Sequence, residues 1–459
     1  MWLWILGLSF FSYGIIKYWV APMLVVLFYK KQGLDINRVP TFGHIAEVVM
    51  NQKLHGDVSY KSKTMARKNP NYLGEAFAIG SYTILHLMDV KLIREHLLKE
   101  DLYRKAYPRT FKHFLGKGGL MFADGDLWKK NRKFILSQFT MDFHKKMIPI
   151  IHEAVMKGIN RIKNGELKNK VILPELELIS GEIVGKIFFG MDLNKFEFNG
   201  MPLSLALTQI VGLIDEVNLS LPFQMLGENF FDLGLLPSHR KIIEDCRGFR
   251  NLFMELIQQK KKDINFSVND DLISLLIGTQ QLEDPNMRFS DEEILDLFLS
   301  VYFPGIQNPA LSDQMLLYCL GRYQESIPEL KEEIANIYNR AAPLTYEALS
   351  RMDLLTGFIK EHFRCFLATG GNLPRVALKD HMVGDIMIKK GTVITIDQFY
   401  NFHHPRYFET PEKFNPKRWL EKKEFDDPFV FIPFGEGPRA CIGQQLTWIQ
   451  FRILVCEML

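Results

Sequence analysis

Cysteine is scarce in this chain, and charge of either sign is nearly balanced. Only five cysteines occur among 459 residues, and no two have the C-x-x-C spacing typical of a zinc site. An odd, scattered set argues against a disulfide framework and favours a reducing compartment. The formal net charge is only +3, so electrostatics give no support for nucleic-acid binding. The sequence also lacks internal repeats, low-complexity tracts and any like-charge run longer than Lys260-Lys261-Lys262.

The N-terminus is, by contrast, almost continuously apolar. Residues 2–28 are broken only by Lys17 and Pro22 and are long enough for one transmembrane helix, although Lys17 costs about 3 kcal/mol near a bilayer centre. A cleaved signal peptide is the alternative, but no basic segment precedes the run and no clear small-residue cleavage site follows it. We therefore expect a retained membrane anchor over residues 1–31. Its basic end, Tyr29-Lys30-Lys31, predicts a cytoplasmic location for the domain that follows.

Helical patterns dominate the rest of the chain. Most of residues 85–370 has helical periodicity, and Ser290-Asp291-Glu292-Glu293 is a capping box that opens a long apolar-periodic stretch to about Leu320. Strand-like segments are few, at residues 76–84, 385–388 and 393–396. This balance predicts a mainly α protein with small β-sheets, an α+β fold. Since no linker is evident, we expect one domain over residues 32–459.

The most informative segment is the loop Phe434-Gly435-Glu436-Gly437-Pro438-Arg439-Ala440-Cys441-Ile442-Gly443. A thiolate is a metal ligand and a nucleophile, and backbone N–H groups in a tight loop can stabilise its charge. Three glycines let this loop turn and approach a flat cofactor closely. Arg439 offers a permanently charged fork for a carboxylate such as a haem propionate. The simpler alternative is a buried cysteine beside a turn.

This loop resembles the haem-binding signature of the cytochromes P-450, the haem-thiolate oxygenases. The resemblance implies that Cys441 is the axial ligand of haem b (iron protoporphyrin IX), with Phe434, Arg439 and Gly443 as signature positions around it. A thiolate ligand of this kind favours O–O cleavage. The resemblance also implies the cytochrome P-450 fold, with haem between the long central helix and the cysteine-ligand loop.

A charge cluster is the second match. Glu361 and Arg364 are three residues apart and share one helix face, which by itself indicates no more than a surface ion pair. In the family, an E-x-x-R pair and the arginine of an F-x-P-x-R segment form a buried cluster. The resemblance therefore implies a structural role for Glu361, Arg364 and Arg418. Removing one member would leave an uncompensated buried charge and cost about 3–5 kcal/mol.

Two further motifs match the family's haem-propionate contacts. Trp128 and Arg132 are one helical turn apart, so both donors point the same way; the alternative is an exposed basic helix. The family's W-x-x-x-R helix places both donors on a propionate, and Arg375 resembles a further propionate arginine. By analogy, three neighbouring lysines would surround the face on which an acidic flavoprotein reductase docks: Lys129, Lys130 and Lys133.

The long helix departs from the family pattern of a small residue, Gly, any residue, an acid and Thr. Here the segment reads Pro304-Gly305-Ile306-Gln307-Asn308-Pro309, so that Gln307 replaces the acid and Asn308 the alcohol. Neither side chain titrates, although an amide can still hold a water molecule in place. Pro309 removes a helical N–H, and we expect it to kink the helix. We expect Gly305, Gln307 and Asn308 to form the oxygen-activation site, with weakened proton delivery.

A second departure lies at the end of the chain. The sequence stops at Leu459, eighteen residues after Cys441, whereas the family continues into a β-hairpin that forms one wall of the substrate pocket. We therefore expect either a C-terminally truncated chain, a fragment of a longer product, or a catalytic domain without that hairpin.

The resemblance implies a haem-thiolate monooxygenase that inserts one oxygen atom of O₂ into a lipophilic organic substrate. Electrons would come from an NADPH-dependent flavoprotein reductase or a cytochrome b-type donor at the endoplasmic reticulum membrane. Two alternatives stay open because the acid–alcohol pair is replaced: a peroxide-using or hydroperoxide-rearranging haem-thiolate enzyme, and a catalytically inactive haem-binding paralogue. Substrate contacts are expected from four segments: Phe111–Phe122, Ile210–Phe231, Tyr302–Asn308 and Ala368–Leu373.

Overall fold

The computed structural model describes residues 12–36, 50–57, 59–79, 82–106, 109–165, 171–220, 223, 228–262, 271–367, 373–421 and 425–459. The chain divides into two compact units. The first unit comprises Met1–Tyr107, Phe363–Phe414 and Lys422–Cys441. The second unit comprises Pro108–His362, Asn415–Glu421 and Ile442–Leu459. Each unit is built from segments far apart in the sequence, so each depends on long-range packing.

The first unit contains a six-stranded sheet. Its order is β1-β2-β3-β10-β7-β4, with bounds Asp35–Ile36, Gly74–Ile79, Tyr82–Leu87, Val393–Ile396, Arg375–Ala377 and Tyr103–Lys105. Strands β2 and β3 are antiparallel, and β3 pairs in parallel with β10. The strand expected over residues 76–84 is therefore part of two strands, because an apolar run does not reveal where a hairpin turns. The strand expected over 393–396 coincides with β10, and the segment expected over 385–388 includes one strand of a separate hairpin, β8 (His381–Val383) with β9 (Ile386–Ile388).

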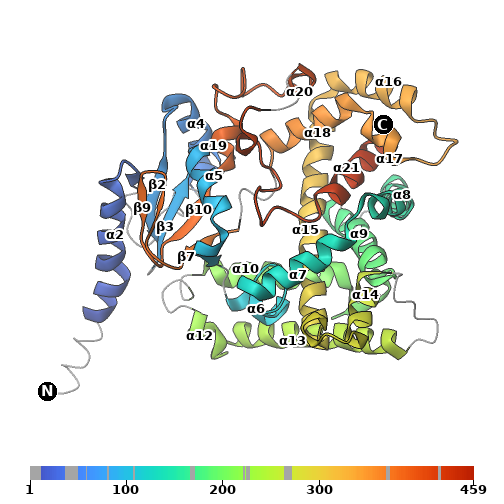
Figure 1. Ribbon diagram of the computed structural model, residues 1–459. Helices are drawn as coiled ribbons and strands as arrows, with labels where there is room; N and C mark the ends of the chain where they lie inside the picture. The colour runs from blue at the N-terminus through green and yellow to red at the C-terminus, as the bar shows by residue number, and fades with distance from the viewer. Residues whose placement is uncertain are drawn as a thin grey trace. The chain divides into compact units, whose positions relative to one another are not determined.

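Helices and short turns complete the first unit. Figure 1 shows helix α2 alongside β2 and β3, and both strands contact it. The remaining elements of this unit are η1 (Ile16–Val20), α2 (Ala21–Lys30), α4 (Tyr60–Lys68), α5 (Val90–Leu98), η2 (Glu100–Leu102), α19 (Gln398–Phe402) and η9 (Pro428–Val430).

Helix α2 belongs to the folded unit although it lies within the expected anchor. Pro22, Val26 and Tyr29 are buried on one face, and the Tyr29 hydroxyl lies 2.8 Å from Oγ1 of Thr392. Gln32 pairs with the backbone of β9, accepting from the Met387 N–H at 2.7 Å. None of the helices in the described ranges has the length and apolar character needed to cross a bilayer. Residues 1–11 of the expected anchor lie outside these ranges.

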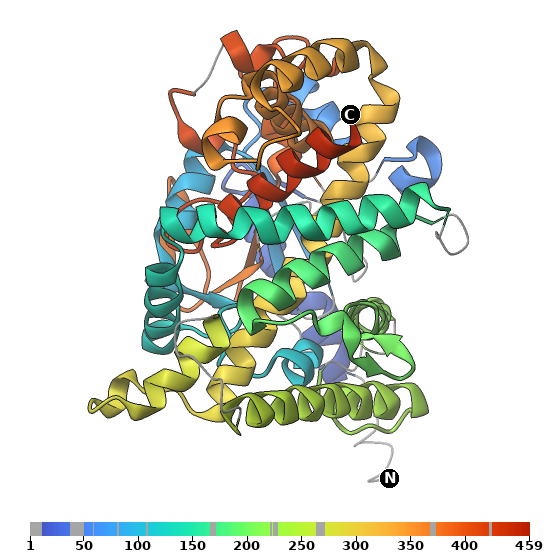
Figure 2. The ribbon, with the colours of Figure 1, turned by 90° about the vertical axis from the view of Figure 1, so that its right-hand side faces the viewer.

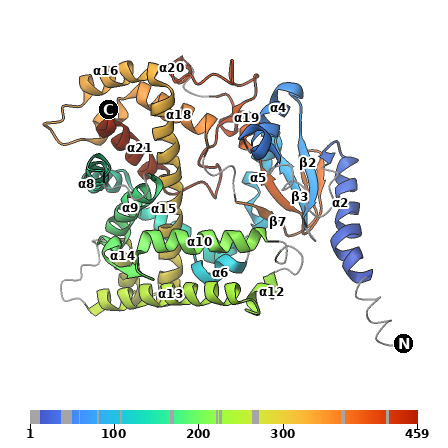
Figure 3. The same cartoon turned by 180° about the vertical axis from the view of Figure 1, so that it is seen from behind.

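The second unit is helical and is organised around α15 (Asp291–Arg322). Figure 2 shows α8 (Met141–Lys163) between α21 (Gln444–Met458) and α9 (Leu173–Val184), and α9 in turn packs against α15. On another side, α10 (Leu203–Leu219) and α13 (Pro237–Lys262) run alongside each other and contact α6 (Arg109–Leu115) (Figure 3). The other elements are α7 (Gly125–Gln138), η4 (Gly185–Phe189), η5 (Leu193–Lys195), β5 (Glu197–Phe198), β6 (Met201–Pro202), α12 (Glu228–Asp232), α14 (Leu272–Gly278), η6 (Thr279–Gln281), η7 (Pro285–Met287), η8 (Gln324–Ser326), α16 (Ile327–Ile337), α17 (Tyr346–Ser350) and α20 (Arg418–Glu421); α18 (Asp353–Cys365) lies mostly in this unit.

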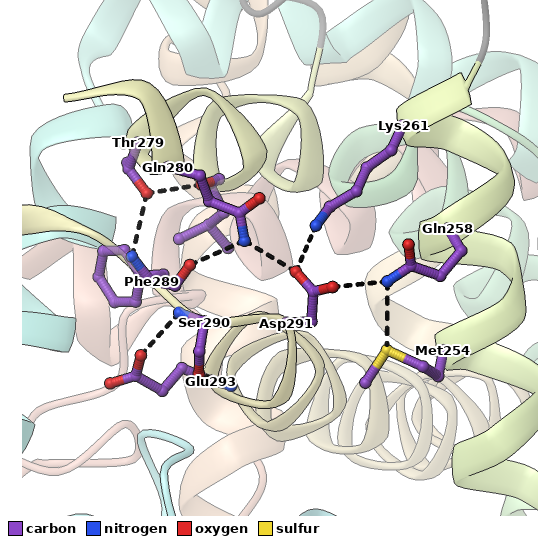
Figure 4. A network of polar contacts seen from close by, with 10 residues as sticks. Met254, Gln258, Lys261, Thr279, Gln280, Phe289, Ser290, Asp291 and Glu293 are labelled. Carbon is purple, nitrogen blue, oxygen red and sulfur yellow. Dashed lines mark hydrogen bonds and ion pairs between the residues drawn. The ribbon is translucent and has the colours of Figure 1, made fainter.

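The start of α15 is fixed by the capping box that the sequence predicts. Ser290 Oγ accepts the Glu293 N–H at 3.2 Å, and Glu293 Oε2 accepts the Ser290 N–H at 2.7 Å. Asp291 accepts further bonds from Lys261, Gln280 and Gln258 (Figure 4). Burial alone would raise the pKa of Asp291, but these bonds outweigh it and lower the pKa. The helix then runs without a break in its helical backbone through Pro304 and Pro309.

Candidate functional site

The cysteine loop is shaped by two glycines in left-handed conformations. Gly435 has a φ of 71° and Gly437 a φ of 81°, values that residues with a Cβ rarely adopt. The Cys441 N–H donates to the Phe434 carbonyl at 2.9 Å, and the Ala440 N–H donates to the Gly437 carbonyl at 3.0 Å. These turns hold Cys441 at one end of a compact loop. Gly443 has a φ of −81°, so its backbone conformation alone does not require glycine.

Cys441 differs from the other cysteines in its accessibility. It is exposed, whereas Cys246, Cys319, Cys365 and Cys456 are buried. The alternative reading of a buried cysteine beside a turn is therefore wrong. Helix α21 begins at Gln444, three residues further on. Because a cysteine thiolate binds metal and Cys441 is accessible, its position suits a metal ligand.

Two arginines of the first unit meet on one carboxylate. Nε of Arg439 donates to Oε1 of Glu100 at 2.6 Å. Nη1 of Arg375 lies 3.1 Å from Oε2 of the same glutamate. Both arginines are nearly buried. The structure thus brings together Arg375 and Arg439, which the sequence predicts as propionate contacts, around a residue that the sequence does not single out.

Trp128 and Arg132 lie on α7 in the second unit. The guanidinium carbon of Arg132 is 5.8 Å from the Trp128 ring centroid, and Trp128 is buried. Because Trp128 and Asn131 are buried, α7 is amphipathic rather than an exposed basic helix. Asn131 Nδ2 fixes the helix by donating to the Gly118 carbonyl at 2.5 Å. The predicted pair of donors therefore shares one side of a firmly packed helix.

The three neighbouring lysines of α7 differ in their exposure and in their contacts. Lys129 and Lys133 are exposed. Lys130 instead donates to the Arg288 carbonyl at 2.7 Å and stacks over the Phe289 ring at 4.3 Å. These contacts place Lys130 beside the start of α15, where it supports the fold.

The segment expected to activate oxygen is accessible in the middle of the central helix. Between Ile294 and Leu317, Asn308 is the one exposed residue of α15. Pro304 and Leu311 are half-buried and lie four residues before and three residues after Asn308, so the three form a stripe along one helix face. Gln307 is also half-buried. Close packing explains the glycine at position 305, because a Cβ there would lie 2.9 Å from Val184 of α9.

Glu361 and Arg418, two of the three residues in the charge cluster that the resemblance implies, form an ion pair. Glu361 is fully buried, and its Oε1 accepts from Nε of Arg418 at 3.1 Å and from the Asn415 N–H at 2.8 Å. Its Oε2 accepts from Nε1 of Trp419 at 2.9 Å. In the first unit, Arg364 is also fully buried and donates to backbone carbonyls at 2.7–3.2 Å: those of Pro411, Phe402 and Lys413.

Two of the expected substrate-contact segments meet in the second unit. The ring centroids of Phe111 and Phe303 are 6.1 Å apart, and those of Phe114 and Phe303 are 6.4 Å apart. Residues 368–372, and residues 221–222 and 224–227 of the third segment, lie outside the described part of the chain.

The donor set of each unit fits the cofactor that the loop motif implies. The first unit offers an accessible cysteine in a glycine-turned loop beside two buried arginines, and a haem carries an iron and two carboxylates. The second unit offers an indole and a guanidinium on one face of α7. Glu100 was missed because its partner Arg439 is 339 positions away, and no local spacing signals such a pair.

Comparison with known proteins identifies the class. The family model described as "Cytochrome P450" matches residues 36–459. The chain is 27% identical to rat (Rattus norvegicus) cytochrome P450 3A18 over 449 residues, covering 94% of this chain and 86% of that protein. It is 25% identical to human (Homo sapiens) cytochrome P450 3A5 over 391 residues, covering 83% of this chain and 76% of that protein. The fold matches the crystal structure of the cytochrome P450DA heme domain with a TM-score of 0.74 at 19% identity, over 93% of this chain and 89% of that one.

This chain belongs to the cytochrome P450 family. Its mainly helical architecture with small sheets is the P450 fold. Family membership implies haem as the cofactor and haem-thiolate monooxygenase activity in general, with an organic substrate and a reductase as partners.

Proposed function

We propose that this chain is a haem-thiolate monooxygenase that inserts one oxygen atom of O₂ into a lipophilic substrate. An NADPH-dependent flavoprotein reductase, or a cytochrome b-type donor, supplies the electrons. The observation that carries this proposal is the accessibility of Cys441, the one exposed cysteine, in a loop turned by Gly435 and Gly437. Residues 32–459 form the catalytic domain in this proposal.

Cys441 would hold the haem iron through its thiolate. Bound haem supplies the oxidation chemistry. Four residues would hold the propionates through charge-assisted hydrogen bonds: Trp128, Arg132, Arg375 and Arg439. Phe434 and Gly443 complete the loop around the ligand. The buried Glu361–Arg418 pair and the buried Arg364 stabilise the segments that carry these groups.

Gly305, Gln307 and Asn308 form the oxygen-activation segment. Asn308 Nδ2 donates and its Oδ1 accepts, so the amide can hold a water molecule at the accessible stripe of α15. Neither amide can release a proton at neutral pH, so proton delivery is slower than with a carboxylate. The matched variant Gln307→Glu with Asn308→Thr restores the acid and alcohol, and we expect it to raise product formed per NADPH consumed.

The substrate is lipophilic in this proposal. The Phe111 and Phe114 rings contact the Phe303 ring, with centroids 6.1 and 6.4 Å apart, so two of the expected substrate-contact segments meet in an aromatic cluster. Apolar side chains in these segments would bind a lipophilic ligand by removing its apolar area from water.

The membrane location rests on the N-terminal helices. The apolar side chains of Ile16 and Trp19 in η1 and of Leu24 and Leu27 in α2 are 42–62% exposed. Such an apolar face favours contact with lipid. We therefore infer anchoring at the endoplasmic reticulum membrane through residues 1–31, with the catalytic domain in the cytoplasm.

The sequence of the central helix α15 favours a second candidate function. Gln307 and Asn308 lack a titratable group, as expected of a peroxide-using or hydroperoxide-rearranging haem-thiolate enzyme, whose oxidant arrives already reduced. A catalytically inactive haem-binding paralogue is the third candidate.

The test has two arms, both with the membrane-bound protein and lipophilic substrates. The first arm contains NADPH, reductase and ¹⁸O₂, and the second contains only a hydroperoxide as oxidant. Labelled product in the first arm supports the monooxygenase, turnover only in the second supports the alternative, and no product in either supports the inactive paralogue.

A further inference from the structure

Glu100 is the meeting point of the two arginines of the first unit. It lies in the 3₁₀ turn η2, and its side chain is 14% exposed. Arg439 follows the glycine turns of the cysteine loop, and Arg375 opens β7. Their side chains are 5% and 3% exposed, so both guanidiniums are held in a largely desolvated place. One carboxylate therefore joins three segments that are distant in the sequence.

The backbone around Glu100 is packed closely against the cysteine loop. A Cβ on Gly437 would lie 3.1 Å from the Leu97 carbonyl oxygen, and the φ of Gly437 is +81°. Arg375 Nη1 also approaches the Leu97 oxygen, at 3.4 Å. The turn that carries Glu100 is thus fixed relative to the loop by backbone contact, and its carboxylate has a defined position from which to orient the arginines.

The three side chains together carry a formal charge of +1, since two arginines face one glutamate. Arginine stays protonated in proteins, so this positive charge persists at every accessible pH. Because Nε of Arg439 donates to Glu100 at 2.6 Å, the orientation of that guanidinium is fixed, and a guanidinium is suited to bind a carboxylate. The arrangement suits a ligand that presents a carboxylate.

We propose that Glu100 is a positioning residue that orients Arg375 and Arg439 toward one propionate of the haem and lowers the reduction potential of the iron. This inference rests on the proposed function, which makes the two arginines propionate contacts. A fixed negative charge near the iron opposes the addition of an electron, and a buried charge is screened less than a surface charge.

The test compares Glu100→Gln with the wild-type protein. The amide keeps the size of the side chain and removes its charge. We expect a more positive midpoint potential in a redox titration, with the thiolate-type carbon monoxide band unchanged. Haem transfer to excess apomyoglobin should become about tenfold faster, the factor for one weakened charge-assisted hydrogen bond. Glu95→Gln is the matched control, because Glu95 pairs with Lys99 at 2.8 Å on the surface; its potential and release rate should match the wild type.

A second pair of variants separates positioning from mere stability. Arg375→Gln removes one positive charge and should shift the potential in the negative direction, and Glu100→Gln with Arg375→Gln should return it toward the wild-type value. The double variant keeps the formal charge of the three positions at +1, as in the wild type, so it also serves if Glu100→Gln alone does not fold.

An unchanged potential and release rate in Glu100→Gln would overturn the inference, as would a lower melting temperature without a change in potential. Absence of compensation in the double variant would also overturn it. A wild-type protein that takes up no haem would refute the proposed function itself, and the inference with it.

Discussion

Gln450 of α21 donates a hydrogen bond from Nε2 to Oδ2 of Asp313 on α15, at 2.7 Å. The same amide nitrogen lies 3.2 Å from Oγ of Ser180 on α9. Asp313 is 1% exposed, and its Oδ1 accepts no hydrogen bond from the part of the chain that the structure describes. Burial raises the pKa of Asp313 to about 8, although the Gln450 bond works in the opposite direction.

The raised pKa of Asp313 predicts a pH-dependent stability. A carboxyl whose pKa is higher in the folded than in the unfolded state stabilises the fold at low pH and loses that contribution as pH rises toward the folded pKa of about 8. The free energy of unfolding should therefore fall by up to about 1.4 kcal/mol per pH unit between the two pKa values. Asp313→Asn keeps an acceptor for Gln450 and removes this slope. Melting temperatures at about pH 5 and about pH 8 check it; equal slopes in the two proteins would refute the assignment.

The buried glutamate of α18 should be essential for folding. Glu361→Ala leaves the largely buried Arg418 without its carboxylate, and we expect a loss of about 3–5 kcal/mol in unfolding free energy. Glu329→Ala is the control, because Glu329 is 50% exposed and pairs with Lys417 of the same segment at 2.8 Å. That change should cost less than about 1 kcal/mol. Chemical denaturation of both variants measures the difference, and similar losses would contradict the structural role of Glu361.

The N-terminal helix α2 should be needed by the sheet of the first unit. The Tyr29 hydroxyl contacts Oγ1 of Thr392 and accepts the Lys389 N–H at 2.9 Å, so Tyr29→Phe should cost about 1–3 kcal/mol. Leu27→Ala, on the exposed face, is the control.

Two truncations test the helix as a whole. Deleting residues 1–20 should preserve the melting temperature of the first unit, whereas deleting residues 1–32 should lower it. Equal melting temperatures for the two truncations would show that α2 is dispensable.

Docking of a reductase should distinguish the lysines of α7. Lys129 and Lys133 are exposed, so charge reversal at either position should raise the KM for an acidic reductase, and added salt should weaken this dependence. Lys130→Ala should instead lower the melting temperature, because Lys130 supports the start of α15. Steady-state kinetics with varied reductase, together with thermal denaturation, separate the effects. An equal rise in KM for all three variants would contradict the distinction.

Local patterns predicted the parts of the fold that local contacts form. Ser290 and Glu293 are three residues apart and close the predicted capping box, and the periodicity that follows is α15. Strands β4 and β7 have three residues each, too few to show an alternation. The sequence merged parts of β2 and β3 because both are apolar. Hydropathy also does not reveal that Val26 and Tyr29, within the predicted anchor over residues 1–31, are buried in the folded first unit.

In the candidate site, too, short motifs could be predicted from the sequence, whereas contacts between distant segments could not. Cys441, Arg439, Trp128 and Arg132 are recognisable because their motifs are short and their spacing is specific. Glu100 and the Asp313–Gln450 contact join segments that are far apart in the chain, with 137 positions separating the second pair. Only the folded structure brings such residues together.

The ligation of iron by Cys441 is the central claim, and the carbon monoxide difference spectrum of the reduced, membrane-bound protein tests it most directly. The account predicts a thiolate-type band in the wild-type protein and its loss in Cys441→Ser, while Cys365→Ser, at a buried cysteine, retains it. A histidine-type band in the wild-type protein, or a thiolate-type band that survives Cys441→Ser, would contradict the account.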